Sequence, residues 1–132
     1  EHLSRGIRRD PDNADMLFNL GQILLRLGRI DEAIAAYRSV LKIDPRHLDA
    51  RSGLATALAT QNHLDPAIRE LSEVVRLAPN MPDAHFNLAA MLEQKGRFGE
   101  ALHHYREVLR IDPSDAAAAQ AAARLRDKGD KP

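Results

Sequence analysis

One pattern recurs along this chain of 132 residues at intervals of thirty-four. The stretch FNLGQILLRLGRIDEAIAAYRSVLKIDP begins at Phe18, a close copy begins at Phe86, and a looser copy begins at Ser52. The same interval separates four prolines: Pro11, Pro45, Pro79 and Pro113. A repeat of this length is typical of architectures in which each unit buries its apolar face against its neighbour. We therefore expect a stack of similar units.

Each unit is predicted to contain two helices, because its apolar residues recur at steps of three and four in two blocks. Residue types that tolerate a left-handed backbone separate the blocks: Gly28, Asn62 and Gly96. The second helices are expected to open at Asp31, at Asp65 with Pro66, and at Gly99, which suit the first positions of a helix. The predicted helices span residues 14–27, 31–43, 48–61, 65–77, 82–95 and 99–111.

The core is expected to consist of two recurring sets of side chains. The first helices contribute Leu20, Leu24, Leu54, Leu58, Leu88 and Leu92. The second helices contribute Tyr37, Leu71, Tyr105, Val40, Val74 and Val108. Small residues at Gly21, Ala55 and Ala89 are expected to face Ala33, Ala67 and Ala101, so that the two helices of a pair approach closely.

The chain is predicted to form a single domain over residues 1–132, with repeats at 14–47, 48–81 and 82–115. Residues 1–13 read as the second helix of an earlier, truncated repeat, with Leu3 and Ile7 in the register of Tyr37 and Leu41. This register and the missing initial Met suggest a piece of a longer protein. A helix at about 115–127 is expected to cap the array, and the division of the domain assigns residues 116–128 to this cap and 129–132 to a tail. Its core positions are predicted to be Ala119, Ala122 and Ala123.

Composition argues against several classes of function. Lys and Arg together number 19, as do Asp and Glu, so no net charge draws the chain to nucleic acid. No apolar run is long enough to insert into a membrane. The absence of cysteine removes thiolate metal sites and disulfides without identifying the compartment, for which the cytoplasm is favoured over the periplasm.

Catalysis and cofactor binding are also not expected. The six histidines lack a spacing that places metal ligands on one helix face, because His103 and His104 are adjacent. They are interpreted as solvated or boundary residues. No nucleophile elbow and no glycine-rich phosphate loop is present, so neither an enzyme nor a nucleotide site is predicted within this segment.

The repeat resembles the tetratricopeptide repeat, whose signature is W-x2-L-G-x2-Y, then A-x3-F, then P, over thirty-four residues. The first unit matches at Leu17, Leu20, Gly21, Leu24, Ala33, Tyr37 and Pro45. The third matches at Leu88, Ala89, Leu92, Ala101, Tyr105 and Pro113. Arg51 and His85 depart from the pattern, because each stands where the first large apolar residue is expected. The resemblance implies an all-α fold, a solenoid of antiparallel helix pairs wound into a right-handed α-α superhelix.

In this family, peptide ligands usually lie in the concave groove formed by the first helices. Transferring that register gives a predicted peptide-binding set of Asp15, Phe18, Asn19, Gln22, Arg26, Asp49, Ser52, Thr56, Asp83, Phe86, Asn87, Ala90, Glu93 and Gln94, with Leu25, Gly53 and Thr60 beside them. Phe18 and Phe86 are large apolar side chains at a solvent-facing position. Asn19 and Asn87 offer an amide that suits a peptide backbone. The alternative is that the phenylalanines pack along their own helices and the asparagines are solvated.

The groove favours one kind of ligand over another. The asparagines are similar to the ladder in the superhelical repeats of O-linked N-acetylglucosamine transferases, although Gly53 interrupts it. A clamp for acidic chaperone tails would need basic residues where Asp15, Asp49 and Asp83 stand. A ligand carrying Lys or Arg is therefore the better match.

The predicted function is a protein-interaction scaffold that binds an extended protein or peptide segment. Two alternatives remain open. The repeats could recruit substrate for a larger enzyme such as a glycosyltransferase, or they could assemble with one another through the exposed N-terminal helix.

Overall fold

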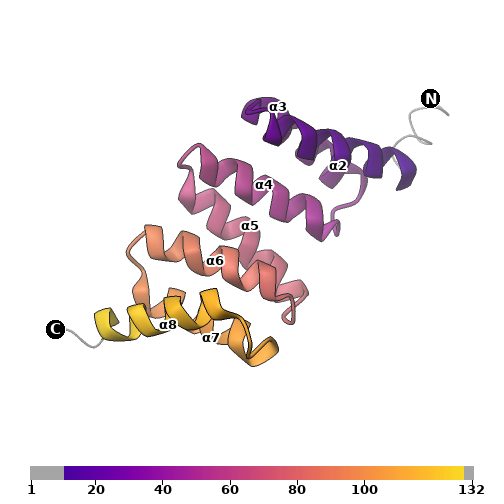
Figure 1. Cartoon of the computed structure of the whole chain (residues 1–132). Coiled ribbons are helices and arrows are strands. Elements are labelled where there is room, and N and C mark those ends of the chain that lie inside the picture. The colour runs from indigo at the N-terminus through magenta and orange to yellow at the C-terminus, as the bar shows by residue number, and fades with distance from the viewer. Residues whose placement is uncertain (1–10, 130–132) are drawn as a thin grey trace. The chain divides into compact units, whose positions relative to one another are not determined.

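The computed structural model describes residues 11–129, which form helices joined by short turns (Figure 1). The helices are α2 (Pro11–Arg26), α3 (Ile30–Ile43), α4 (Leu48–Thr60), α5 (Leu64–Leu77), α6 (Pro82–Gln94), α7 (Phe98–Ile111) and α8 (Ala116–Gly129). No strand occurs among the described residues, and the all-α prediction is confirmed. The chain divides into two compact units, residues 1–70 and 71–132, with the division inside α5.

The turns inside the helix pairs follow the sequence prediction. Gly28, Asn62 and Gly96 have φ angles of 80°, 64° and 79°. At the first of these turns the Arg29 N–H donates to the Leu24 carbonyl over 2.9 Å, and the Gly28 N–H donates to the Leu25 carbonyl over 3.1 Å. This pair of bonds is the Schellman motif, which satisfies the last carbonyls of a helix. Equivalent bonds close the turns at Asn62 and Gly96.

Each second helix begins one residue earlier than predicted, at Ile30, Leu64 and Phe98. The N-caps of α3 and α7 are Arg29 and Arg97, and neither side chain caps its helix. The residue that completes the Schellman turn also serves as the N-cap of the next helix, which shortens the turn. Asp31 therefore lies in the first turn of α3, where its charge complements the helix dipole. α2 begins at Pro11, three residues before the predicted start.

In the first unit, the ring of Tyr37 leaves room only for glycine at two neighbouring positions, residues 21 and 53. Tyr37 of α3 is 1% exposed. A Cβ atom at Gly21 of α2 would lie 2.8 Å from Tyr37 Cε1, and a Cβ atom at Gly53 of α4 would lie 2.6 Å from Tyr37 Cζ. Both distances are shorter than real contacts. The ring therefore occupies the space that side chains at residues 21 and 53 would need.

One predicted core residue of the first unit lies at the surface. Leu20 is 46% exposed, whereas its counterparts Leu54 and Leu88 are 2% and 1% exposed. The periodicity places Leu20 correctly on the apolar face of α2. The prediction is wrong because no other described element covers that face.

The second unit buries Tyr105, Val108, Leu88 and Leu92. Its last helix, α8, packs against α7, but it does so with a different face from the one predicted. Ala118, Ala121 and Leu125 are buried, whereas Ala119 and Ala123 are exposed and Ala122 is half-buried. A run of alanines gives no contrast between faces, so Leu125 sets the register of this helix.

Candidate peptide-binding site

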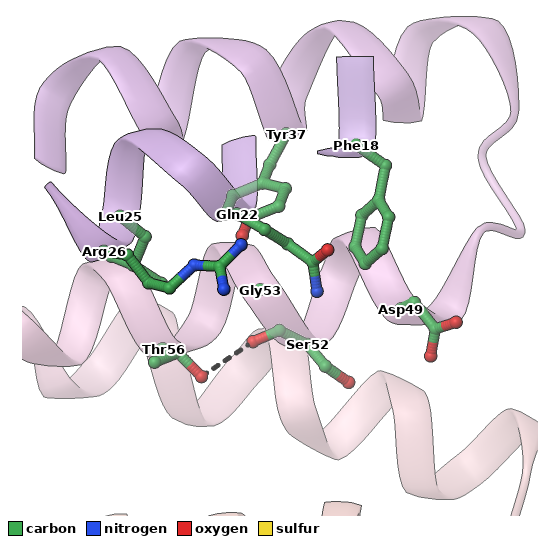
Figure 2. Close-up of a pocket in the computed structure, with 9 residues that line it drawn as sticks. All are labelled: Phe18, Gln22, Leu25, Arg26, Tyr37, Asp49, Ser52, Gly53 and Thr56. Atoms are coloured by element: carbon green, nitrogen blue, oxygen red, sulfur yellow. Dashed lines mark hydrogen bonds between the residues drawn. The ribbon is translucent and has the colours of Figure 1, made fainter. Parts of the chain in front are cut away.

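A pocket of about 620 Å³ opens in the first unit. Its walls come from α2 and α4, and α3 contributes Tyr37, as Figure 2 shows. The lining residues are Phe18, Gln22, Leu25, Arg26, Tyr37, Asp49, Ser52, Gly53 and Thr56. We call this the first-unit pocket.

The first-unit pocket brings together most of the groove residues predicted for α2 and α4. Phe18, Gln22, Arg26, Asp49, Ser52 and Thr56 all line it, as do Leu25 and Gly53. Asp15 and Asn19 are exposed and lie outside the lining. Tyr37 was predicted only as a core residue, yet it also lines the pocket. The two glycines that its ring requires were the signal in the sequence that could have placed it there.

Both apolar and polar side chains line the pocket. Phe18 is half-buried, with its ring centroid 6.0 Å from that of Tyr37 and 5.1 Å from that of His47. Other side chains of the same chain therefore cover part of the Phe18 ring. This agrees in part with the alternative that the phenylalanines pack within the chain. Gln22 points into the space between α2 and α4 in Figure 2. The Thr56 hydroxyl donates to the Ser52 carbonyl over 3.1 Å, so it is already engaged.

The charges of the first-unit pocket lie at opposite ends. Figure 2 shows Arg26 beside Leu25 and Thr56, and Asp49 beyond Phe18. Burial raises the pKa of the Tyr37 hydroxyl above its usual value, although Arg26 opposes part of that rise. The hydroxyl therefore stays protonated at neutral pH and can donate a hydrogen bond. A ligand in the pocket meets a cation at one end, an anion at the other, and aromatic carbon between them.

The groove residues predicted for the third repeat lie in the second unit, where several are engaged within the chain. Phe86 packs edge-on against Tyr105, with ring centroids 5.3 Å apart. Glu93 accepts a hydrogen bond from the Tyr105 hydroxyl over 3.0 Å and pairs with Arg124 of α8 over 2.7 Å. The remaining members are at or near the surface: Asp83, Asn87 and Gln94 are exposed, and Ala90 is half-buried.

Glu93 and Arg124 stand at the repeat positions that two residues of the first-unit pocket occupy. Glu93 and Arg124 lie sixty-eight residues, or two repeats, after Leu25 and Thr56. The same two positions therefore line a pocket in the first unit and form an ion pair in the second. Burial and the hydrogen bond with Glu93 raise the pKa of Tyr105 to about 12, so this hydroxyl remains a donor.

The core residue of each second helix differs in size, and this difference explains why Gly53 stands where an asparagine would continue the series. Tyr37 is followed sixteen residues later by Gly53, and Tyr105 is followed at the same distance by Ala121. Leu71, which stands where the two tyrosines stand, is followed by Asn87. Because the Tyr37 ring fills the space beside Gly53, an asparagine side chain has no room at that position.

Two polar pairs account for Arg51 and His85, which depart from the apolar pattern. Arg51 pairs with Glu70, nineteen residues later, over 2.8 Å, and donates to the Pro45 carbonyl over 2.9 Å. His85 is 5% exposed. Its Nδ1 lies 3.0 Å from Nδ1 of His104, again nineteen residues later, and its Nε2 lies 2.8 Å from the Pro79 carbonyl. The interpretation of the histidines as solvated or boundary residues is therefore wrong for His85.

The hydrogen bonds around His85 determine which ring nitrogens carry protons. The Pro79 carbonyl can only accept, so Nε2 of His85 donates to it. In neutral His85, Nδ1 then accepts a hydrogen bond from the Nδ1–H group of His104. Protonating both rings would place two N–H groups against each other. Burial, together with His103 and His85, lowers the pKa of His104 to about 4, although Glu107 and Glu100 of the same helix oppose the shift.

Acid is therefore expected to destabilise the second unit through His104. In the unfolded chain His104 titrates near its ordinary pKa of about 6.5, so the unfolded state binds more protons than the folded state between pH 6.5 and pH 4. The stabilisation is complete above pH 6.5 and is lost as the pH falls toward 4. Because His104 is partly solvated, we expect a loss of about 1–2 kcal/mol. Urea unfolding at a series of pH values measures it.

The control for this pH effect is His104→Gln, whose amide can still donate to His85 but does not titrate. Its stability should vary less than that of the wild type between pH 7 and pH 4.5. His63→Asn removes an exposed histidine and should leave the pH profile unchanged. Parallel profiles for the wild type and the His104 variant would show that the pair does not limit stability in acid.

Residues 11–129 contain neither a cluster of metal-ligating side chains nor a membrane-spanning helix. No group of three or more His, Cys, Asp and Glu side chains in that range is arranged to hold a metal ion. None of the helices described there is both long enough and apolar enough to cross a bilayer.

Helix pairs repeated every thirty-four residues, with a ligand-sized pocket between neighbouring first helices, define a helical-repeat binding protein. The chain belongs to the tetratricopeptide repeat family. Models of that family, each described as Tetratricopeptide repeat, match residues 24–92, 82–115 and 2–35. A search of curated protein sequences returns no match.

Solved structures of several repeat proteins share the fold. The first TPR of Spaghetti (RPAP3), bound to the HSP90 peptide SRMEEVD, is 22% identical with a TM-score of 0.88, over 96% of this chain and 100% of that one. MamA is 21% identical with a TM-score of 0.84, over 96% and 74% of the two chains. The TPR domain of Arabidopsis OM64 is 17% identical with a TM-score of 0.82, over 87% and 95%. At these identities the likeness concerns the fold.

Proposed function

We propose that this chain is a protein-interaction module and that its first-unit pocket binds an extended peptide. The tetratricopeptide repeat family and a fold shared with a peptide-bound TPR support a protein-interaction scaffold. The observation that carries the peptide site is the pocket itself. It combines an aromatic floor with polar side chains on two adjacent helices, which is the mixture that fixes a ligand and its orientation.

The charges of the pocket suggest the chemistry of the ligand. A peptide that lies along the pocket would place a Lys or Arg near Asp49, an apolar side chain against Phe18 and Tyr37, and an acidic group or C-terminus near Arg26. The peptide SRMEEVD, which is bound to the first TPR of RPAP3, carries one arginine, two glutamates and a terminal aspartate. In this chain the lining residues include a single Arg and a single Asp. A peptide with charges of both signs therefore matches better than a purely acidic one.

Two further functions from different classes remain hypotheses. Self-association is favoured by a row of exposed apolar side chains on and just beyond α2: Met16, Leu20, Ile23 and Leu27. Recruitment of substrate to an enzyme on the same polypeptide stays a prediction from the sequence, and we propose no catalytic role for the described residues.

The second unit supplies the variant that tests the peptide site. Leu25→Glu with Thr56→Arg introduces into the first-unit pocket the side chains that pair in the second unit as Glu93 and Arg124. The Tyr37 hydroxyl can donate to the introduced carboxylate, as Tyr105 does to Glu93. We expect the pocket to close while the helices remain intact. Affinity for a peptide selected on the wild-type protein from a random twelve-residue library should fall about 30-fold or more, measured by fluorescence anisotropy.

The reverse exchange is the matched control. Glu93→Leu with Arg124→Thr makes the same chemical change in the second unit, where it should alter the affinity of the selected peptide by less than about two-fold. Circular dichroism would verify that both variants stay helical. If Leu25→Glu with Thr56→Arg binds the peptide as tightly as the wild type, the site lies elsewhere.

A further inference from the structure

Within residues 11–129, four of the five large apolar side chains that are most exposed lie in one row on and just beyond α2. Met16 is 68% exposed, Leu20 46%, Ile23 48% and Leu27 65%. Their spacings of four, three and four residues place them on one face of the helix. We call them the α2 stripe. Isolated surface hydrophobes need no explanation, but a contiguous row of this kind indicates an interaction surface.

The repeat shows what kind of element covers such a stripe. The counterparts of Met16 and Ile23 in α4 are Ala50 and Ala57, both 0% exposed, and α4 packs against the preceding helix α3. In α8 the counterparts are Ala118 and Leu125, also 0% exposed, and α8 packs against α7. This face of a first helix is therefore built to receive another helix. Among the described residues, α2 has no such covering.

We propose that the α2 stripe pairs with the α2 stripe of a second copy of this chain, with the two helices antiparallel. None of the four side chains of the α2 stripe lines the first-unit pocket, so the proposal goes beyond peptide binding. An antiparallel arrangement with its centre between Leu20 and Ile23 places Met16 of one copy opposite Leu27 of the other. It also places Leu20 opposite Ile23, so every member of the stripe meets an apolar partner. A two-fold axis of this kind gives the commonest form of closed oligomer.

Charge favours the antiparallel direction over the parallel one. Asp15 and Arg26 are eleven residues apart, which is about three helical turns, so they flank the stripe on the same side. Both side chains are exposed. Antiparallel pairing brings Asp15 of one copy near Arg26 of the other, whereas parallel pairing places the corresponding residues of the two copies on opposite sides of the helix pair and forms no such contact. The helix dipoles also oppose each other in the antiparallel arrangement.

The size of the stripe predicts a weak dimer. Four side chains a copy cover less than the roughly 800 Å² a partner that is typical of stable complexes. We therefore expect a dissociation constant for the dimer of about 10–500 μM. The competing occupant is the chain's own segment at residues 1–10, where the register places Leu3 and Ile7. That segment lies outside the described residues, and coverage by it would leave the chain monomeric.

Sedimentation velocity of the full chain between about 5 and 500 μM tests the proposal. The expected result is a rise in sedimentation coefficient from monomer toward dimer. Leu20→Glu with Ile23→Glu changes two exposed side chains, so it should retain helicity and weaken dimerisation at least ten-fold. Leu77→Glu, which changes the 39% exposed Leu77 in the second unit, is the matched control and should dimerise as the wild type does. A monomer at every concentration, or equal dimerisation of the double variant, would overturn the proposal.

The direction of pairing has its own test, because the chain contains no cysteine. Met16→Cys and Leu27→Cys are made as separate single variants and oxidised with oxidised glutathione. A mixture of the two should form the mixed disulfide at least ten-fold faster than either variant forms a disulfide with itself. Faster pairing of either variant with itself would contradict the antiparallel arrangement.

Discussion

Gly53→Asn is expected to destabilise the first unit by about 2–3 kcal/mol, although asparagine suits a helix better than glycine does. A Cβ atom at residue 53 would lie 2.6 Å from Cζ of Tyr37. The ring cannot move away easily, because it is 1% exposed and a Cβ atom at Gly21 on α2 would already lie within 2.8 Å of it. Urea unfolding monitored by circular dichroism measures the effect.

Tyr37→Leu provides the test of this explanation. Leucine at residue 37 reproduces the combination of Leu71 and Asn87 found in the second unit. The double variant Tyr37→Leu with Gly53→Asn should therefore be more stable than the sum of the two single effects predicts, by at least 1 kcal/mol. Asn87→Gly is the control on the other side and should cost less than about 1 kcal/mol, because Asn87 is exposed. Additive single effects would contradict the proposed clash with the ring.

Glu70→Ala is expected to cost about 2 kcal/mol. Arg51 and Glu70 form an ion pair of 2.8 Å in which the two side chains are only 21% and 26% exposed. Without Glu70, the Arg51 guanidinium keeps its bond to the Pro45 carbonyl but loses its counter-charge in a partly buried site. Arg51 Nε already lacks a hydrogen-bond partner, so the remaining guanidinium would be poorly compensated. The measurement is again the free energy of unfolding in urea.

Replacing both Arg51 and Glu70 should restore most of the stability that Glu70→Ala loses. The first repeat has Leu17 and Ala36 at the same two positions, so Arg51→Leu with Glu70→Ala substitutes the apolar pair that the chain already uses. Exchanging a buried ion pair for apolar residues is often neutral or stabilising. The double variant should therefore be within about 1 kcal/mol of the wild type. A double variant as unstable as Glu70→Ala would show that the unpaired arginine is not the cause.

The sequence predicts the helices well because period and turn chemistry agree. The left-handed positions at Gly28, Asn62 and Gly96 fix where each first helix ends. The starts of α3 and α7 lie earlier than predicted, since the arginine that completes each of those turns is not a typical N-cap residue. The register of α8 was wrong because alanine alone does not distinguish one helix face from another. The division into repeats with boundaries at 14–47, 48–81 and 82–115 stays a prediction.

The sequence predicted which helix face carries the candidate site. It did not predict that Tyr37 lines the site or which side chains pair with Arg51 and His85. The family register selects the helix face that carries Gln22, Ser52 and Thr56 without showing that Tyr37 reaches the same space. Arg51 and His85 were recognised as anomalies in the repeat. Their partners nineteen residues later could not be read from a pattern of apolar residues, because both pairs connect polar side chains across two helices. The choice between pocket and ion pair at Leu25 and Glu93 likewise depends on side chains in the next first helix.

The central claim is that the first-unit pocket is the peptide site, and an NMR titration tests it most directly. Uniformly ¹⁵N-labelled protein would be titrated with the peptide selected from the random library. We predict that the largest shift changes occur at Gln22, Gly53 and Thr56 and that those at Gln22 and Gly53 disappear in Leu25→Glu with Thr56→Arg. Shift changes confined to exposed residues away from the pocket, such as Arg38, Lys42 and Arg69, with the pocket signals unmoved, would contradict the claim.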